Sequence, residues 1–240
     1  GRRYRYMIVL DADTGAFKRM WGAFGNKPTD IPPRQTDVRA AAGPRFTGGA
    51  EQFMTEYFLN GGKEPPEQTP AAQVRQRNEI DFNDKGPDQF NLVHDLKVSN
   101  DGLVYVADRK GLRVQVFTLD GKFVSQVFVD RYCGVGIDAG CSNSPQTAGS
   151  VGFSADPEQR FLYVGSRTPA RIWIYDRKTL EPLDSFGRSG VAPGEFVAFH
   201  ELTTDSKGNI YTADLAGTRV TKFLFKGLAK KSVNATGAGK

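Results

Sequence analysis

The 240-residue sequence has few of the residues that most often carry chemistry, with only two histidines and two cysteines. It also lacks long apolar runs. Met7–Leu10 and Val127–Val129 are among the longest, and they fall far short of the roughly 20 residues that a membrane-spanning helix needs. The sequence therefore predicts no membrane span. A Gly-x-Ser-x-Gly motif and a glycine-rich phosphate loop are both missing, so neither a serine hydrolase nor a nucleotide-binding loop is expected.

Charge of one sign is not concentrated in the chain, whose formal net charge is only +5. The one dense basic stretch is the C-terminal tail, which includes Lys222, Lys226, Lys230 and Lys231. A solvated chain end accounts for such a stretch, and we expect no nucleic-acid partner.

Glycine and phenylalanine, in contrast, are abundant, with 27 and 17 copies. Few helical patterns accompany them, so the composition favours many short strands joined by tight turns. The chain opens on Gly1 without an initiator methionine or an apolar leader, and we expect a mature or incomplete chain.

Two segments, Phe90–Phe117 and Phe196–Phe223, align without a gap and are identical at eleven of 28 positions. An ungapped match of this density indicates a structural repeat. In the first copy, alternating apolar residues and turn residues predict strands at 96–98, 103–107 and 113–117, and a fourth at 123–128. Four successive antiparallel strands are typical of one propeller blade.

Further copies of the pattern lie between and before these two. A third copy has strand-like runs at 161–164 and 171–175, so the 106-residue offset between the first two spans two blades. Residues 7–22 match the latter half of another blade. About three and a half blades are therefore expected.

The pattern Phe-x-x-x-His-Asp-Leu-x-Val-x-x-Asp-Gly-x-Val-Tyr-Val-Ala-Asp-Arg, which begins at Phe90, resembles NHL repeats. The runs 184–190 and 205–212 are similar to a bacterial group of six-bladed NHL propellers that are often exported. The resemblance implies an all-β, NHL-type β-propeller of four-stranded antiparallel blades, with about three and a half of six present. It also implies a periplasmic or extracellular location.

The predicted organisation has six parts. These are the latter half of a blade at 1–24, an insertion with little regular structure at 25–85, blades at 86–135, 136–190 and 191–228, and a flexible basic tail at 229–240. Three and a half blades do not close a ring, and open strand edges seek partners. We therefore expect the missing N-terminal part of the propeller, or another protein chain, to complete it.

Both histidines, His94 and His200, occupy the same position of alternate blades, where the chain enters the innermost strand. Two imidazoles converging there are suited to a divalent metal. The alternative is that each merely caps its strand. Neither alternative is excluded by the spacing.

The same positions resemble those of the peptidyl-α-hydroxyglycine α-amidating lyases, six-bladed propellers whose zinc is held by histidines from three alternate blades. His94 and His200 match two of these ligands, without the proline that precedes them in the family, and the third is expected upstream of Gly1. The resemblance implies catalytic roles for Arg109 and, loosely, Tyr4. A surface or inter-blade salt bridge is the alternative for Arg109.

Asp95 and Glu201 directly follow the histidines, and the resemblance implies that one of them helps to bind a structural calcium ion at the channel. Carboxylates suit that cation. Hydrogen bonds to blade-edge amides are the alternative. The spacing of Cys133 and Cys141 would allow a disulfide that closes a loop in an oxidising compartment. The alternative is that both remain free thiols.

Two functions from different classes follow. One is an exported propeller that acts as a binding or assembly module, with or without a metal in its central channel. The other is a zinc-dependent, lyase-like enzyme. The incomplete ring, the long insertion and the incomplete catalytic set favour the first.

Overall fold

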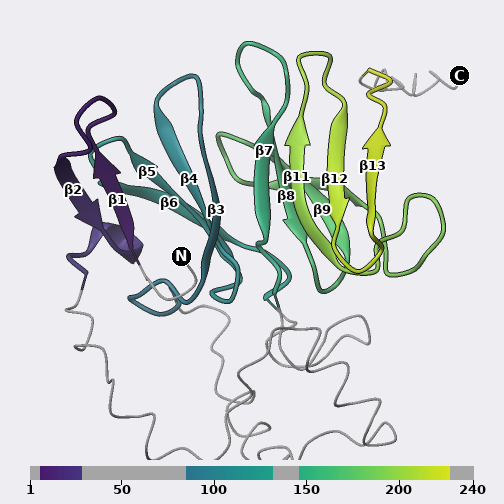
Figure 1. Cartoon of the computed structure of the whole chain (residues 1–240), viewed down its shortest axis with the longest axis horizontal. Coiled ribbons are helices and arrows are strands. Elements are labelled where there is room, and N and C mark those ends of the chain that lie inside the picture. The colour runs from purple at the N-terminus through teal and green to yellow at the C-terminus, as the bar shows by residue number, and fades with distance from the viewer. Residues whose placement is uncertain (1–5, 29–84, 132–145, 228–240) are drawn as a thin grey trace, which may run out of the picture.

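The computed structural model describes residues 6–28, 85–131 and 146–227. Strands dominate these residues, and the helical part is one short 3-10 turn at Ala23–Gly25. The strands form four antiparallel sheets that follow one another in chain order (Figure 1). Within the described residues, no helix has the length and apolar character that crossing a membrane would require.

Each sheet is a meander, and we number the sheets as blades. The first blade has two strands, β1 (Met7–Leu10) and β2 (Phe17–Trp21). The second consists of β3 (Val93–Val98), β4 (Leu103–Asp108), β5 (Arg113–Thr118) and β6 (Phe123–Phe128). The third consists of β7 (Ser150–Phe153), β8 (Phe161–Ser166), β9 (Arg171–Asp176) and β10 (Pro182–Phe186). The fourth consists of β11 (Phe199–Thr204), β12 (Ile210–Asp214) and β13 (Arg219–Phe223).

This architecture confirms the predicted all-β fold of four-stranded antiparallel blades. The described part of the fourth blade consists of three strands, and the described part of the first blade consists of the two outer strands. The innermost strands β3, β7 and β11 lie side by side, as neighbouring blades of a propeller require (Figure 1). Of the expected 25–85 insertion, only residues 25–28 and 85 are described, and the tail from 229 lies outside the described residues.

Blades bury their faces against one another because successive strand residues point to opposite sides. In β5, Val114 and Val116 pack toward the third blade, whereas Phe117 packs toward the first. A continuous apolar core therefore fills the space between each pair of blades. Its members between the third and fourth blades are Tyr163, Ala170, Ile172, Phe196, Phe199, Leu202 and Ile210.

A buried ion pair ties strands together within a blade. Asp108, at the end of β4, accepts hydrogen bonds of 2.9 Å from the two backbone N–H groups just before β3, and Arg113 Nε donates to it at 3.2 Å. Both side chains are fully buried. Asp214 and Arg219 repeat the arrangement in the fourth blade at 3.3 Å. The repeated Asp–Arg pair is thus architectural.

A second polar link joins neighbouring blades. Arg177, in the turn between β9 and β10, donates to both carboxylate oxygens of Asp101 at 2.9 and 3.0 Å and to Tyr105 Oη at 3.2 Å. Arg177 is itself almost fully buried. This bidentate contact fixes the second blade against the third.

The two ends of the arc carry faces that no described residue covers. On the first blade, the cross-strand pairs Ile8/Met20 and Leu10/Phe17 are exposed, and we call these four residues the leading face. On the fourth blade, Ala213 and Val220 are exposed beside Lys222, and we call these three residues the trailing face. Both faces belong to sheets whose opposite sides are buried.

We expect Asp108→Ala to lower the free energy of unfolding by about 3–5 kcal/mol, because it leaves a buried guanidinium and two backbone N–H groups without their acceptor. Urea denaturation followed by circular dichroism measures this. The exposed Glu158→Ala is the control and should change the free energy by less than about 0.5 kcal/mol. A loss below about 1 kcal/mol for Asp108→Ala would contradict the structural role of the pair.

Candidate metal-binding site at the inner strands

Both histidines lie at β-bulges on inner strands. The register of β3 against β4 shifts between Val93 and Asp95, and the register of β11 against β12 shifts between Phe199 and Glu201. The histidine in each pair of positions is the extra residue, and a bulge re-aims such a side chain out of the regular alternation. As a result the rings of His94 and His200 approach with centroids 4.9 Å apart.

The third blade lies between the two blades that carry the histidines, and it has Gly149 at the position equivalent to His94 and His200. Its carbonyl oxygen lies 2.6 Å from Nδ1 of His94. A Cβ at Gly149 would lie only 3.2 Å from the Gly165 carbonyl oxygen, so a larger residue would crowd the strand. The intervening blade therefore contributes a backbone acceptor rather than a side chain.

The hydrogen bonds of His94 determine its tautomer. Arg109 Nη1 lies 2.6 Å from Nε2 of His94, and a guanidinium can only donate. Nε2 is therefore the acceptor, which leaves Nδ1 to carry the proton and donate to Gly149. Burial lowers the pKa of His94, the Gly149 carbonyl opposes this, and the charges of Arg109 and His200 lower it further. The ring is held in its neutral form.

Glu201 completes a cluster of possible metal ligands. Its Oε1 lies 3.5 Å from Nδ1 of His94 and 3.9 Å from Nδ1 of His200, and one ligand atom from each of the three residues lies within 4.8 Å of the others. Burial raises the pKa of Glu201 to about 7, and the neighbouring Asp95 adds to this, while Lys97 and Arg109 oppose it.

Two imidazoles and one carboxylate are a donor set that zinc accepts. In tetrahedral zinc sites, metal–ligand bonds of about 2.0–2.2 Å bring ligand atoms to about 3.3 Å from one another, so these three would have to draw closer. A Nδ1 proton held by a backbone carbonyl is the arrangement that usually presents Nε2 to a metal. Arg109 occupies that nitrogen, so it would have to move away for His94 to ligate.

Asp95 lies beside this cluster but is engaged in structural contacts. Its Oδ2 accepts a hydrogen bond from the Val151 N–H on the neighbouring inner strand at 2.9 Å, and its Oδ1 lies 3.0 Å from Lys97 Nζ. This is the blade-edge amide bond that the sequence offered as the alternative to a calcium ligand. Tyr4, Cys133 and Cys141 lie outside the described residues.

Sequence reasoning brought together the histidines and the residues that follow them, and it missed the features that orient them. No sequence motif marks the bulges or the position of the Gly149 carbonyl. The contact between Arg109 and His94 was also not predicted, although the repeat places Arg109 at the matching end of β4.

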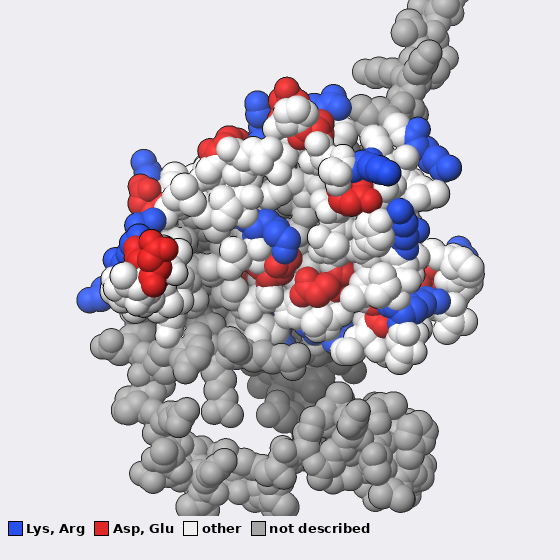
Figure 2. Space-filling model, turned by 45° about the horizontal axis from the view of Figure 1, so that its top comes forward, with Lys and Arg blue, Asp and Glu red and all other residues white. Residues whose placement is uncertain are grey.

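Charged side chains show no large patch of one sign on the visible described surface, where Lys and Arg alternate with Asp and Glu (Figure 2). Basic charge therefore does not dominate this face of the molecule.

Comparison with known proteins identifies an NHL repeat at residues 90–117. Human NHL repeat-containing protein 3 is 27% identical over 147 residues, which is 59% of this chain and 38% of the human protein. The chain therefore spans well under half the length of this relative. Residues 90–117 belong to the segment from which the sequence predicted the fold, and the described sheets have the arrangement of β-propeller blades.

Solved structures include two propellers with partial likeness. The WD40 repeats of RRP9 match with a TM-score of 0.37 and 14% identity, covering 55% of this chain and 38% of that one. The β-propeller domain of Cps50 (Swd1) from Myceliophteria thermophila matches with a TM-score of 0.38 and 11% identity, covering 56% and 41%. Structural matches with TM-scores this low support no conclusion about the candidate site.

Glu201 should make stability fall as pH rises. Its folded pKa of about 7 exceeds the ordinary value of 4.5, so the folded state binds the proton more tightly between these two values. In metal-free buffer, we expect Glu201→Gln to raise the melting temperature at pH 8 relative to the parent and to have little effect at pH 4. Glu158→Gln, at an exposed position, is the control. An equal shift at both pH values would show that Glu201 is not desolvated.

Proposed function

We propose that this chain is part of an exported binding or assembly propeller whose open blade faces are covered by further propeller chain or by another protein. The supporting observation is that identical residues of the repeat differ in burial. Leu202 is 3% exposed, whereas Leu96, at the same position two blades earlier, is 39% exposed. Val114 is 0% exposed, whereas its counterpart Val220 is 73% exposed.

The location of each exposed copy explains the difference. Leu202 packs against the third blade, whereas Leu96 faces the first blade, whose inner strands are not among the described residues. Val114 packs against the third blade, whereas Val220 lies on the last blade described. Positions that bury apolar side chains between blades are thus left open at both ends, and exposed apolar patches of this kind favour a protein partner.

Export is proposed on the resemblance of residues 184–190 and 205–212 to exported propellers. Expression of the protein from its complete gene, followed by fractionation of the cells, decides between an exported and a retained protein.

The open faces should make the isolated chain self-associate. In sedimentation velocity, we expect its weight-average sedimentation coefficient to rise with protein concentration, and we expect Ile8→Lys combined with Met20→Lys to abolish the rise, because charges on the leading face cannot be buried unpaired. The control is Val124→Lys, an exposed apolar residue outside both open faces. A parent chain that stays monomeric at all concentrations, or a control variant that behaves like the double variant, would count against the proposal.

A second candidate function is binding of a divalent metal, with zinc-dependent lyase activity as its catalytic form. The cluster of His94, His200 and Glu201 supports it, once Arg109 has moved away from Nε2 of the first histidine. Bound zinc would supply a Lewis acid at the channel. His94 and His200 would bind it, Glu201 would add a carboxylate, and Arg109 would hold a positive charge beside it.

Zinc binding is tested by equilibrium dialysis of the full chain with Cys133→Ser and Cys141→Ser, so that thiols do not compete. We expect one zinc ion per chain, a loss of affinity of at least about tenfold for His94→Ala or His200→Ala, and a gain for Arg109→Gln, because this change removes a competing donor and a positive charge. Equal affinity in the histidine variants would contradict the site. Zinc binding without glyoxylate release from a peptidyl-α-hydroxyglycine would exclude the lyase form alone.

A further inference from the structure

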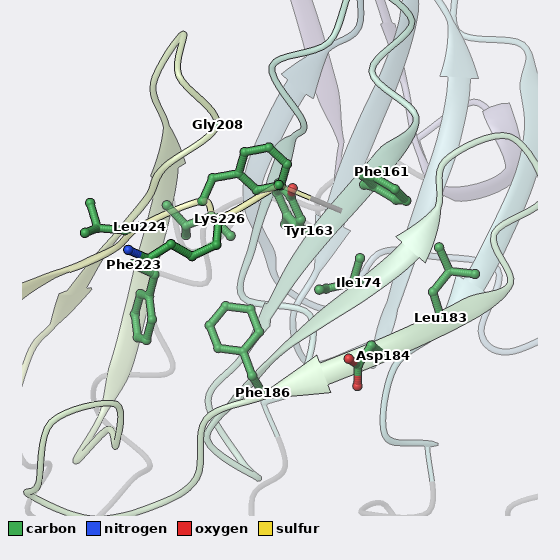
Figure 3. Close-up of a pocket in the computed structure, with 13 residues that line it drawn as sticks. Phe161, Tyr163, Ile174, Leu183, Asp184, Phe186, Gly208, Phe223, Leu224 and Lys226 are labelled. Atoms are coloured by element: carbon green, nitrogen blue, oxygen red, sulfur yellow. The ribbon is translucent and has the colours of Figure 1, made fainter. Parts of the chain in front are cut away.

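Two pockets between neighbouring blades differ in the side chains that line them. One, of about 460 Å³, lies between the third and fourth blades and is mainly apolar. In Figure 3 the side chains of Ile174 and Phe186 point toward the same space as Phe223. All three side chains also pack against the buried core between these blades, so the apolar pocket continues that core.

The other pocket, of about 430 Å³, lies between the second and third blades and is lined by polar and cationic side chains. Arg109 and Lys110 line it from the turn that follows β4, and Arg167 lines it from the turn that follows β8. Asn91 and Gln146, in the segments that lead into β3 and β7, complete its polar lining. None of the residues that line this pocket carries a carboxylate. The pocket therefore offers positive charge, and we call it the cationic pocket.

Hydrogen bonds hold both walls of the cationic pocket in place. The Arg109 N–H donates to the Leu92 carbonyl at 2.9 Å, and the Arg167 N–H donates to the Gln146 carbonyl at 3.1 Å. Each turn is thus tied to the segment that leads into the inner strand of its own blade. Arg109 is only 7% exposed, and its Nη1 lies 2.6 Å from Nε2 of His94. The cationic lining is therefore anchored before any ligand arrives, which lowers the entropic cost of binding.

The architecture of a blade does not require arginine at these places. Arg109, Arg167 and Leu215 are the first residues after β4, β8 and β12, so they occupy one repeat position in three blades. Leu215 is 59% exposed, and its N–H makes the corresponding backbone hydrogen bond, to the Ala198 carbonyl at 3.0 Å. An apolar side chain thus serves the fold at this position. Two arginines on either side of one pocket point instead to a ligand.

The groups that face the cationic pocket are mainly hydrogen-bond donors. Guanidinium and ammonium groups can only donate. The Oε1 of Gln146 is buried, which leaves the Nε2 end of the amide as the part that a ligand can reach. Three cationic groups and an amide nitrogen suit an anion that has several oxygens and more than one negative charge. A guanidinium binds such oxygens in pairs, and phosphate is the common group with this chemistry.

We propose that the cationic pocket binds a phosphate group, as the free ion or as part of a small ester. Lys110 and Arg167 contact its oxygens from the two blades, Arg109 adds charge beneath it, and Gln146 donates from its amide. A volume of about 430 Å³ lies in the range of small-molecule sites and leaves room for the organic part of an ester. The site needs no metal, so this inference goes beyond both proposed functions.

Isothermal titration calorimetry of the full 240-residue chain tests the proposal, with EDTA present so that no metal mediates binding. We expect one inorganic phosphate to bind per chain with a dissociation constant below about 1 mM. Acetate should bind about tenfold more weakly or worse, because it has one charge and two oxygens. Glycerol 3-phosphate distinguishes the two sources of the group. Binding as tight as that of phosphate, or tighter, assigns the pocket to an ester, and weaker binding assigns it to the free ion.

Substitution of Arg167 locates the binding. Arg167→Gln should weaken phosphate binding by about tenfold or more, because a charge-assisted hydrogen bond is lost, and Arg167→Lys should fall between this variant and the parent. The matched control is Arg160→Gln, which removes the same charge at the other end of β8, where the side chain is exposed and outside the pocket. Its affinity for phosphate should stay within about twofold of the parent value. The circular dichroism spectra of all three variants should match that of the parent.

Several outcomes would overturn the proposal. They are the absence of saturable phosphate binding by the parent chain, an unchanged affinity in Arg167→Gln, and an equal loss in Arg160→Gln. Acetate binding as tight as that of phosphate would also overturn it, because the pocket would then recognise a single negative charge. The sedimentation test uses the leading face and the dialysis test uses zinc, so a failure here rejects this inference without rejecting either proposed function.

Discussion

The structure depends on one constraint, which is that a propeller blade is apolar on both faces of its sheet and needs a neighbour on each side. Strands β4 and β5 show this, since Val106 and Phe117 pack toward the first blade and Ala107 and Val114 toward the third. A sheet with two such faces cannot be stable alone in water. Polar links such as that of the buried Arg177 with Asp101 then fix the angle between blades whose apolar contacts are non-directional.

The same constraint explains why the arc ends as it does. Val220 stands at the repeat position of the buried Val114 and is exposed, whereas Lys222 on the same face replaces the buried Val116. The exposed apolar side chains at both ends are the reason why we propose them as binding surfaces.

The sequence predicted the blades well because their signals are local. Turns such as Asp101-Gly102 need a left-handed residue, which glycine supplies with φ of 79°, and alternating residues on either side predict the strands. The candidate site was predicted only in part. The repeat placed His94 and His200 at matching positions, but the bulges that aim them and the Gly149 carbonyl between them arise from strand pairing across blades, which leaves no local trace.

The contact of Arg109 with His94 illustrates the same limit. The residues are 15 positions apart on two paired strands, and the sequence alone suggested a metal ligand and a catalytic arginine rather than a hydrogen bond between them. Asp95 is a similar case, because the amide that it binds belongs to the next blade. Side-chain roles that depend on a neighbouring blade become visible only when the blades are placed together.

Amide hydrogen exchange on the isolated chain tests the central claim most directly, because it reports the protection of each strand. If the blades of the arc are stabilised by neighbours on both faces, the amides of β5 and β9 should exchange slowest, and those of β1 and β13 should exchange markedly faster, since each of these strands has one open face. Equal protection of β1, β5, β9 and β13 would contradict the account, because it would mean that the ends of the arc are already covered.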